Sequence, residues 1–114
     1  MAKVTITKKL EEEINKIFKG QSVEIFKLMK SLENSPTKGK VLGQISGIVI
    51  KELKWNSYRF YFITDGYKLR VMDEASLTDL LIKFVRMSDK KDQQQTIDEI
   101  RKILINLGSK GFDD

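Results

Sequence analysis

A series of β-type segments, separated by connections too short for a crossover, is the feature of this sequence that most constrains its fold. Asn56–Ser57 is a two-residue turn between two such segments, and Asp65–Gly66 is typical of a β-hairpin turn. A short connection at Asp73–Ser76 precedes the last segment. Connections of this length join antiparallel neighbours, so we expect an antiparallel meander. Its predicted strands are Ile48–Trp55, Tyr58–Thr64, Tyr67–Met72 and Leu80–Arg86.

Two segments with a helical spacing of apolar residues precede this meander. After a short β-like start at Val4–Ile6, Thr7 is a suitable N-cap for a first helix, which Gly20 ends. Ser22 is a suitable cap for a second helix. Because only a few residues separate the two helices, we expect an antiparallel pair. The apolar stripes are Leu10, Ile14, Ile17 and Phe18 in the first helix and Ile25, Leu28, Met29 and Leu32 in the second.

The segment between the helices and the meander is predicted to be irregular. It contains Pro36, the only proline of the chain, within the loop 34–40. Gly43 and Gly47 extend this irregular region. The first strand of the meander is therefore expected to begin at Ile48.

A final helix follows the meander. It begins at Asp92, with Gln95 in the position of a capping box, and ends at Gly108. Together the patterns predict one α+β domain over residues 1–108. In this domain an N-terminal helical hairpin packs on a four-stranded antiparallel sheet, plus the short N-terminal strand, and a C-terminal helix follows. We expect residues 109–114 to form a frayed tail.

The composition limits the chemistry that this chain can perform. It contains no His and no Cys, which excludes Ser-His and Cys-His nucleophilic triads and the usual zinc ligands. We therefore expect neither a metal nor a cofactor. Lys and Arg number 21 against 16 acidic residues, and the net charge of +5 favours an anionic partner such as nucleic acid. A charge of this size also occurs in proteins that are simply soluble.

The sequence shows no segment that targets or spans a membrane. Met1–Thr7 lacks the apolar core of a signal peptide. The longest apolar run, Ile45–Ile50, is interrupted and is far shorter than a membrane span. We expect a cytoplasmic protein without a membrane partner.

Cationic residues are frequent on the predicted strands. Side-chain alternation puts Arg59 and Tyr61 on one face, away from Phe60 and Phe62, which are expected to be core beneath the helices. A cationic face with exposed aromatics suits RNA, because cations bind phosphates and rings stack on bases. A central-strand arginine needs a partner, either a carboxylate such as Glu52 or a bound anion. For the lysines, protection of strand edges against aggregation is the simpler alternative.

Four short stretches carry a family resemblance through their order and spacing. They are Ser35–Gly43 (SPTKGKVLG), Lys51–Lys54 (KELK), Ser57–Phe62 (SYRFYF) and Leu81–Arg86 (LIKFVR). They resemble the Pro-x-x-Gly-Lys-x-Leu loop and the Glu-Leu-Arg, Tyr-Arg-x-x-Tyr and Phe-Val-Lys-Lys strands of the RelE/ParE toxin superfamily. The resemblance is closest to the phage-derived HigB-like branch.

The resemblance implies the toxin component of a type II toxin–antitoxin system, a metal-independent endoribonuclease that cleaves mRNA on the ribosome. The family's catalytic strand arginine corresponds to Arg59, and the basic position on the preceding strand to Lys54. The basic residue of the last strand corresponds to Arg86, and Tyr61 is a second candidate for proton transfer beside Lys54. The implied partners are a cognate antitoxin, mRNA and the ribosome. The residues expected to bind RNA are Lys51, Lys83, Arg70 and Lys68.

Cleavage of this kind is intelligible without histidine. The 2′-OH of RNA can attack the adjacent phosphate if cations neutralise the developing charge and a group supplies a proton. Many relatives use a His or a C-terminal Tyr for this purpose, whereas this chain has no His and its last tyrosine is Tyr67. Two alternatives therefore stay open. One is a non-nuclease protein of the same fold, either a gyrase inhibitor or an inactive partner-binding relative, and the other is an unrelated RNA-binding domain.

Overall fold

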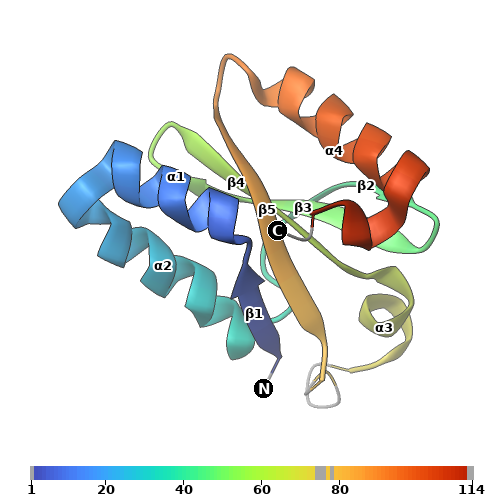
Figure 1. Cartoon of the computed structure of the whole chain (residues 1–114). Coiled ribbons are helices and arrows are strands. Elements are labelled where there is room, and N and C mark those ends of the chain that lie inside the picture. The colour runs from blue at the N-terminus through green and yellow to red at the C-terminus, as the bar shows by residue number, and fades with distance from the viewer. Residues whose placement is uncertain (1, 74–76, 78, 113–114) are drawn as a thin grey trace.

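The computed structural model describes residues 2–73, 77 and 79–112, which form a five-stranded sheet with helices on both faces (Figure 1). The helices and strands are β1 (Lys3–Ile6), α1 (Lys8–Phe18), α2 (Ser22–Lys30), β2 (Lys40–Ile45), β3 (Ile48–Trp55), β4 (Tyr58–Asp65), α3 (Gly66–Val71), β5 (Leu81–Asp89) and α4 (Gln93–Leu107). The 3₁₀ turns η1 (Lys19–Gln21), η2 (Ser31–Glu33) and η4 (Gly108–Phe112) follow α1, α2 and α4. The expected α+β class, with a helical hairpin, a sheet and a C-terminal helix, is confirmed.

The sheet is mixed rather than wholly antiparallel. Its strand order is β1-β5-β4-β3-β2, and the four strands from β2 to β5 pair antiparallel. β1 lies parallel to β5, with Val4 opposite Ile82. This pairing is possible because most of the chain lies between the two strands, which is ample length for a crossover.

The segment expected to be irregular contains strand β2. It forms a hairpin with β3 through Ser46 and Gly47, whose φ angles of 49° and 83° suit a two-residue turn. The register shifts between Val41 and Gly43, which marks a bulge. Gly43 within β2 and Gly47 in the following turn obscured this strand in the sequence, because glycine has low strand propensity. Pairing with β3 overrides that preference.

The third strand expected at Tyr67–Met72 is instead the short helix α3. Asp65 is its N-cap, and its Oδ1 accepts hydrogen bonds from the backbone N–H groups of Tyr67 at 2.9 Å and Lys68 at 3.1 Å. Asp-Gly favours a hairpin turn, but Asp is equally favoured at a helix N-cap. Residues 74–76 of the expected connection lie outside the described residues.

Helices α1 and α2 cover one face of the sheet, called here the hairpin face. Leu10, Ile14 and Phe18 of α1 are buried against strand residues such as Phe60 and Phe62, as expected. Ile17, also expected in this stripe, is 49% exposed. The N-cap Thr7 is also confirmed, since its hydroxyl accepts a hydrogen bond from Leu10 N. The expected Ser22 cap is wrong. Ser22 is the first residue of α2, and its hydroxyl donates to the carbonyl of Lys19.

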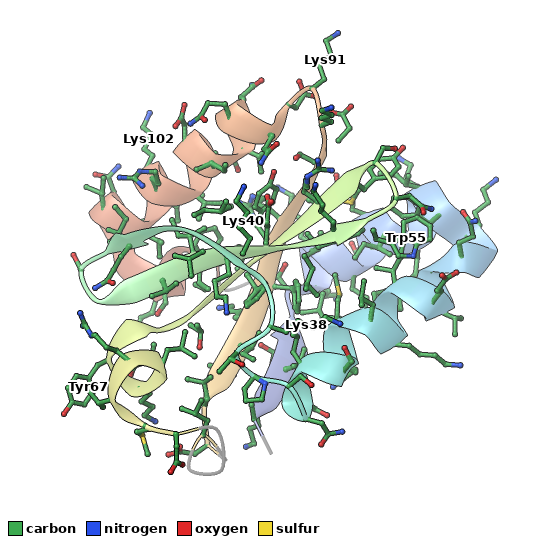
Figure 2. The ribbon with its side chains drawn as sticks, turned by 180° about the vertical axis from the view of Figure 1, so that it is seen from behind. Lys38, Lys40, Trp55, Tyr67, Lys91 and Lys102 are labelled. Carbon is green, nitrogen blue, oxygen red and sulfur yellow. The ribbon has the colours of Figure 1, made fainter. Side chains whose placement is uncertain are left out.

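Helix α4 covers the opposite face, called here the α4 face, and Figure 2 shows Lys102 of α4 and Trp55, which packs near α1, on different sides of the sheet. Ile100 and Leu104 pack there with Ile50 and Ile63 of the sheet. Asp92 is the N-cap as expected, but it makes no side-chain capping bond, so the capping box is absent.

The tail is ordered up to residue 112 rather than frayed. Its turn η4 folds back so that Phe112, 3% exposed, joins the core of the α4 face. Gly111 permits this turn, because a Cβ there would lie 2.5 Å from Ile103 Cγ2. Residues 113–114 lie outside the described residues. Within the described part of the chain, no helix has the length and apolar character needed to cross a membrane.

Candidate nucleic-acid interface

The four residues expected to perform chemistry lie in two neighbouring rows on the α4 face. Side chains directly opposite each other on neighbouring strands share a face and lie about 4.5–5.5 Å apart at their Cβ atoms. Tyr61 belongs to the core of the α4 face, which fixes the side of its row. The first row is Lys54, Arg59 and Ser88, and the second is Lys40, Glu52, Tyr61 and Arg86. We call these seven residues the cation rows.

Arg59 is buried rather than exposed. Its exposed fraction is 7%, so the expectation that its side chain lies open to solvent is wrong. The guanidinium Nε is fully shielded and has no hydrogen-bond partner. A buried donor without a partner is unfavourable by about 1–3 kcal/mol. Among the described residues of the cation rows, Arg59 is therefore the side chain with a buried donor that has no acceptor.

Lys54 lies directly opposite Arg59 and is exposed. Two like charges at a cross-strand pair destabilise a sheet unless an anion lies between or near them. Lys54 is thus an accessible cation beside the buried one.

Tyr61 is completely buried, with an exposed fraction of 0%. Its hydroxyl lies 2.7 Å from Ser88 Oγ, and burial raises the pKa of the phenol, against the opposing effect of the Ser88 hydrogen bond. A phenol that keeps its proton and contacts no solvent cannot exchange a proton with a substrate. The expectation of an exposed tyrosine beside Arg59 is wrong, because α4 covers this face.

Arg86 is held by α4 and η4. Its Nε donates to Glu99 Oε1 at 2.8 Å, and its Nη1 donates to the carbonyl of Val85 at 2.7 Å. The guanidinium carbon also lies 5.1 Å from the centre of the Phe112 ring, within cation–π range. Arg86 therefore links the last strand to the C-terminal helix.

Glu52 is the acidic residue of the cation rows and is 3% exposed. It was a possible carboxylate partner for Arg59. Its Oε2 accepts a hydrogen bond from Gln93 Nε2 at 3.2 Å, while Arg59 Nε stays without a partner. Glu52 therefore does not supply the missing acceptor for Arg59 Nε.

Lys51, one of the lysines expected to bind RNA, is buried on the hairpin face. It is 3% exposed, and its Nζ donates to the carbonyl of Thr37 at 2.9 Å and lies 5.8 Å from the centre of the Phe62 ring. Burial lowers the pKa of its ammonium group. Lys51 anchors the loop before β2 and is not part of the cationic surface.

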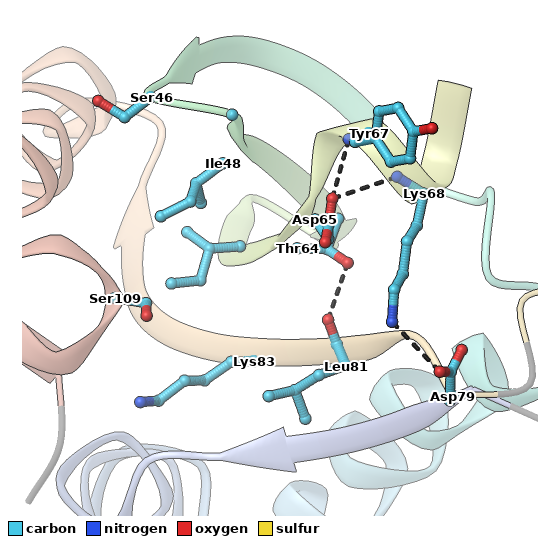
Figure 3. Close-up of a pocket in the computed structure, with 12 residues that line it drawn as sticks. Ser46, Ile48, Thr64, Asp65, Tyr67, Lys68, Asp79, Leu81, Lys83 and Ser109 are labelled. Carbon is cyan, nitrogen blue, oxygen red and sulfur yellow. Dashed lines mark hydrogen bonds and ion pairs between the residues drawn. The ribbon is translucent and has the colours of Figure 1, made fainter. Parts of the chain in front are cut away.

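The other three expected RNA-binding residues lie away from the cation rows. Lys68 and Arg70 are on α3 rather than on a strand. Lys83 lies opposite Ile63, nearer the start of β5 than Arg86 and Ser88. Lys68 and Lys83 line a pocket of about 570 Å³ at this end of the α4 face (Figure 3).

Several contributors to the interface were not singled out from the sequence. Ser88, Gln93 and Glu99 contact residues of the cation rows through hydrogen bonds, and Phe112 does so through its ring. Period-two alternation beyond Arg86 would have pointed to Ser88. The contacts from α4 and η4 depend on tertiary packing and leave no local signal.

Comparison with known proteins gives no relative: no family model, curated protein or solved structure matches this chain. The fold and the site themselves are those of an α+β protein with a cationic, partly buried sheet surface.

Proposed function

We propose that this chain is the toxin component of a type II toxin–antitoxin pair and that it cleaves mRNA without a metal, with Arg59 and Lys54 at the reacting phosphate. The proposal places the protein in the cytoplasm, with the ribosome as the place of action and an antitoxin as its partner. The observation that carries it is the buried Arg59 guanidinium, whose Nε lacks an acceptor and which faces a second cation across the ladder.

A phosphodiester meets both needs of this pair. Its oxygens accept hydrogen bonds from a guanidinium, and its negative charge offsets the repulsion between Arg59 and Lys54. Arginine is well suited to binding phosphate from a buried position, because its guanidinium group is rigid and weakly hydrated. Exposed Lys54 provides the first contact for the approaching strand.

The chemistry follows from the placement of these cations. In the cleavage step the 2′-oxygen bonds to phosphorus, the bond from phosphorus to the 5′-oxygen breaks, and the 2′-hydroxyl proton passes to water. Arg59 stabilises the additional negative charge on the phosphorane oxygens. The Lys54 ammonium donates a proton to the departing 5′-oxygen. Tyr61 has no part in proton transfer, because it is buried and holds Ser88.

Inducible expression in bacteria tests the proposal. We expect growth arrest and mRNA cut during translation, and we expect Arg59→Met and Lys54→Met to abolish both. Lys102→Met, which changes an exposed lysine on α4, is the matched control and should stay toxic. Normal growth with intact mRNA on expression of the folded wild-type protein would contradict the proposal.

A second candidate function is a non-nuclease protein of the same fold that inhibits gyrase or only binds a partner. It is favoured by the states of Arg86 and Tyr61, because two of the four residues expected to act on RNA are occupied by structural contacts. Growth arrest with DNA damage and intact mRNA would indicate gyrase inhibition. Tolerated expression together with tight partner binding would indicate an inactive relative.

A further inference from the structure

A cavity lies on the α4 face, at the opposite end of β4 from Arg59. Six residues of strand separate Arg59 from Asp65, which is about 20 Å. Figure 3 shows Lys68 of α3 running along one side of this pocket to Asp79, with Ser46 and Ser109 on the other side. Its volume of about 570 Å³ is within the usual range for small-molecule sites.

The walls of the pocket are fixed by specific contacts. The turn at Gly47 packs against the start of α3, where Gly66 N donates to the Gly47 carbonyl at 2.8 Å. A Cβ at Gly66 would lie 2.7 Å from Val49 Cγ2, so only glycine allows this approach. The Lys68–Asp79 ion pair, at 3.2 Å, joins α3 to the segment before β5. The cavity is thus a built feature of the fold rather than a gap between loops.

The charges of the lining residues select against an anionic ligand. Lys68 and Lys83 are offset by Asp65 and Asp79, although the protein as a whole has a net charge of +5. One of these cations, Lys68, is already neutralised by its ion pair. A phosphate or carboxylate therefore gains little here, in contrast with the cation rows.

The remaining lining groups suit a flat, uncharged ring with polar edges. Ile48, Ile63 and Leu81 provide an apolar surface, and Tyr67, which also lines the pocket, is an exposed residue. The hydroxyl of Thr64 donates to the Leu81 carbonyl and keeps acceptor capacity. Aliphatic and aromatic side chains bind the faces of bases, while hydroxyls and carboxylates bind their edges.

We propose that this pocket, between α3, the Ser46–Gly47 turn and β5, binds a nucleobase. This proposal rests on the proposed function for the origin of the ligand, because a base of the RNA strand that is cut at Arg59 would reach the pocket. A free nucleoside carries the same chemistry, so the experiment below separates the two sources.

Nuclear magnetic resonance titration of the full chain tests the pocket directly. Adenosine and uridine are added separately, and we expect shifts in the backbone amide signals of residues 46–48 and 64–68, with smaller changes at Lys54 and Arg59. Adenosine 5′-monophosphate should bind this pocket no more tightly than adenosine. A single-stranded RNA tetranucleotide should shift both regions together if the base comes from a bound strand, whereas shifts at the pocket from nucleosides alone identify a free nucleoside as the ligand.

Variants separate binding from folding. Tyr67→Ala should weaken nucleoside binding at least about fivefold, as expected from loss of one stacking ring. Val71→Ala, at an exposed position on α3 outside the pocket, should leave the affinity unchanged. The proposal is overturned if folded protein shows no pocket shifts with either nucleoside. It is also overturned if N-acetyl-tryptophanamide binds as tightly as the nucleosides, which would indicate a protein side chain as the ligand. Nucleoside binding without RNA cleavage would retain the pocket and reject only the nuclease.

Discussion

At the scale of single residues, the two buried cations Lys51 and Arg59 differ in how their charges are satisfied. Lys51 donates to the Thr37 carbonyl, whereas Arg59 Nε has no acceptor. Both are cations on internal strands of the sheet, and the sequence assigned Arg59 to catalysis and Lys51 to RNA binding. Lys51 is therefore a structural anchor, and Arg59 is the candidate anion site.

Lys51 should make stability depend on pH in the alkaline range. Because burial lowers its pKa in the folded state, the unfolded chain binds more protons between that pKa and the ordinary value of about 10.4. The free energy of unfolding should therefore rise with pH in this interval. Urea unfolding of the wild type and Lys51→Met, from about pH 7 to about pH 10, should show their difference moving in favour of the wild type. A constant difference across this range would contradict the lowered pKa.

Arg59→Met and Tyr61→Phe should have opposite effects on stability, although the two residues are neighbours on β4. Arg59→Met removes an unsatisfied buried donor and should leave the free energy of unfolding equal to or above that of the wild type. Tyr61→Phe removes the hydrogen bond to Ser88 and should lower it by about 1 kcal/mol. Denaturant unfolding at neutral pH measures both. A loss of several kcal/mol in Arg59→Met would mean that its guanidinium is already satisfied.

At the scale of elements, α3 depends on its N-cap. Asp65→Ala removes two side-chain hydrogen bonds and should destabilise the protein by about 1 kcal/mol. Asp92→Ala is the matched control, because Asp92 is the N-cap of α4 but makes no side-chain capping bond. Thermal unfolding should show a clear decrease for the first variant and a change of a few tenths of a kcal/mol at most for the second. Equal losses would mean that α3 is held by packing alone.

The elements whose boundaries carry a distinctive local signal were predictable from the sequence. Thr7 and the spacing of Leu10, Ile14 and Phe18 located α1 well. Asp65–Gly66 did not decide between a hairpin turn and a helix start, because both use the same residues. Strand β2 was not recognisable, since its pairing with β3 stabilises a segment of low intrinsic strand propensity.

The site shows the same division between local pattern and tertiary packing. Alternation on β4 correctly put Arg59 and Tyr61 on the face opposite Phe60 and Phe62. It could not show that α4 lies on that face. The reason for this packing is that Ile50, Ile63 and Val85 make part of the face apolar, and the apolar side of α4 needs such a surface.

At the scale of the whole molecule, the C-terminal turn η4 completes the core of the α4 face. Phe112→Ala should reduce the free energy of unfolding by about 3 kcal/mol, because a buried ring and its contact with Arg86 are lost. Leu107→Ala, at a position that is 66% exposed, should cost less than about 0.5 kcal/mol. Urea unfolding of the two variants compares them directly. A small effect at Phe112 would indicate that η4 contributes little to the fold.

The parallel pairing of β1 with β5 also determines when the protein acquires its shape during translation. β1 is synthesised before the rest of the sheet, yet Val4 has no strand partner until Ile82 has been made. Arg86 and Ser88 follow later still, so the strand on the second side of Arg59 pairs with β4 only when most of the chain has emerged. If the proposed function holds, a nascent chain interrupted before that point lacks the complete surface assigned to RNA and would not yet act on the ribosome that is producing it.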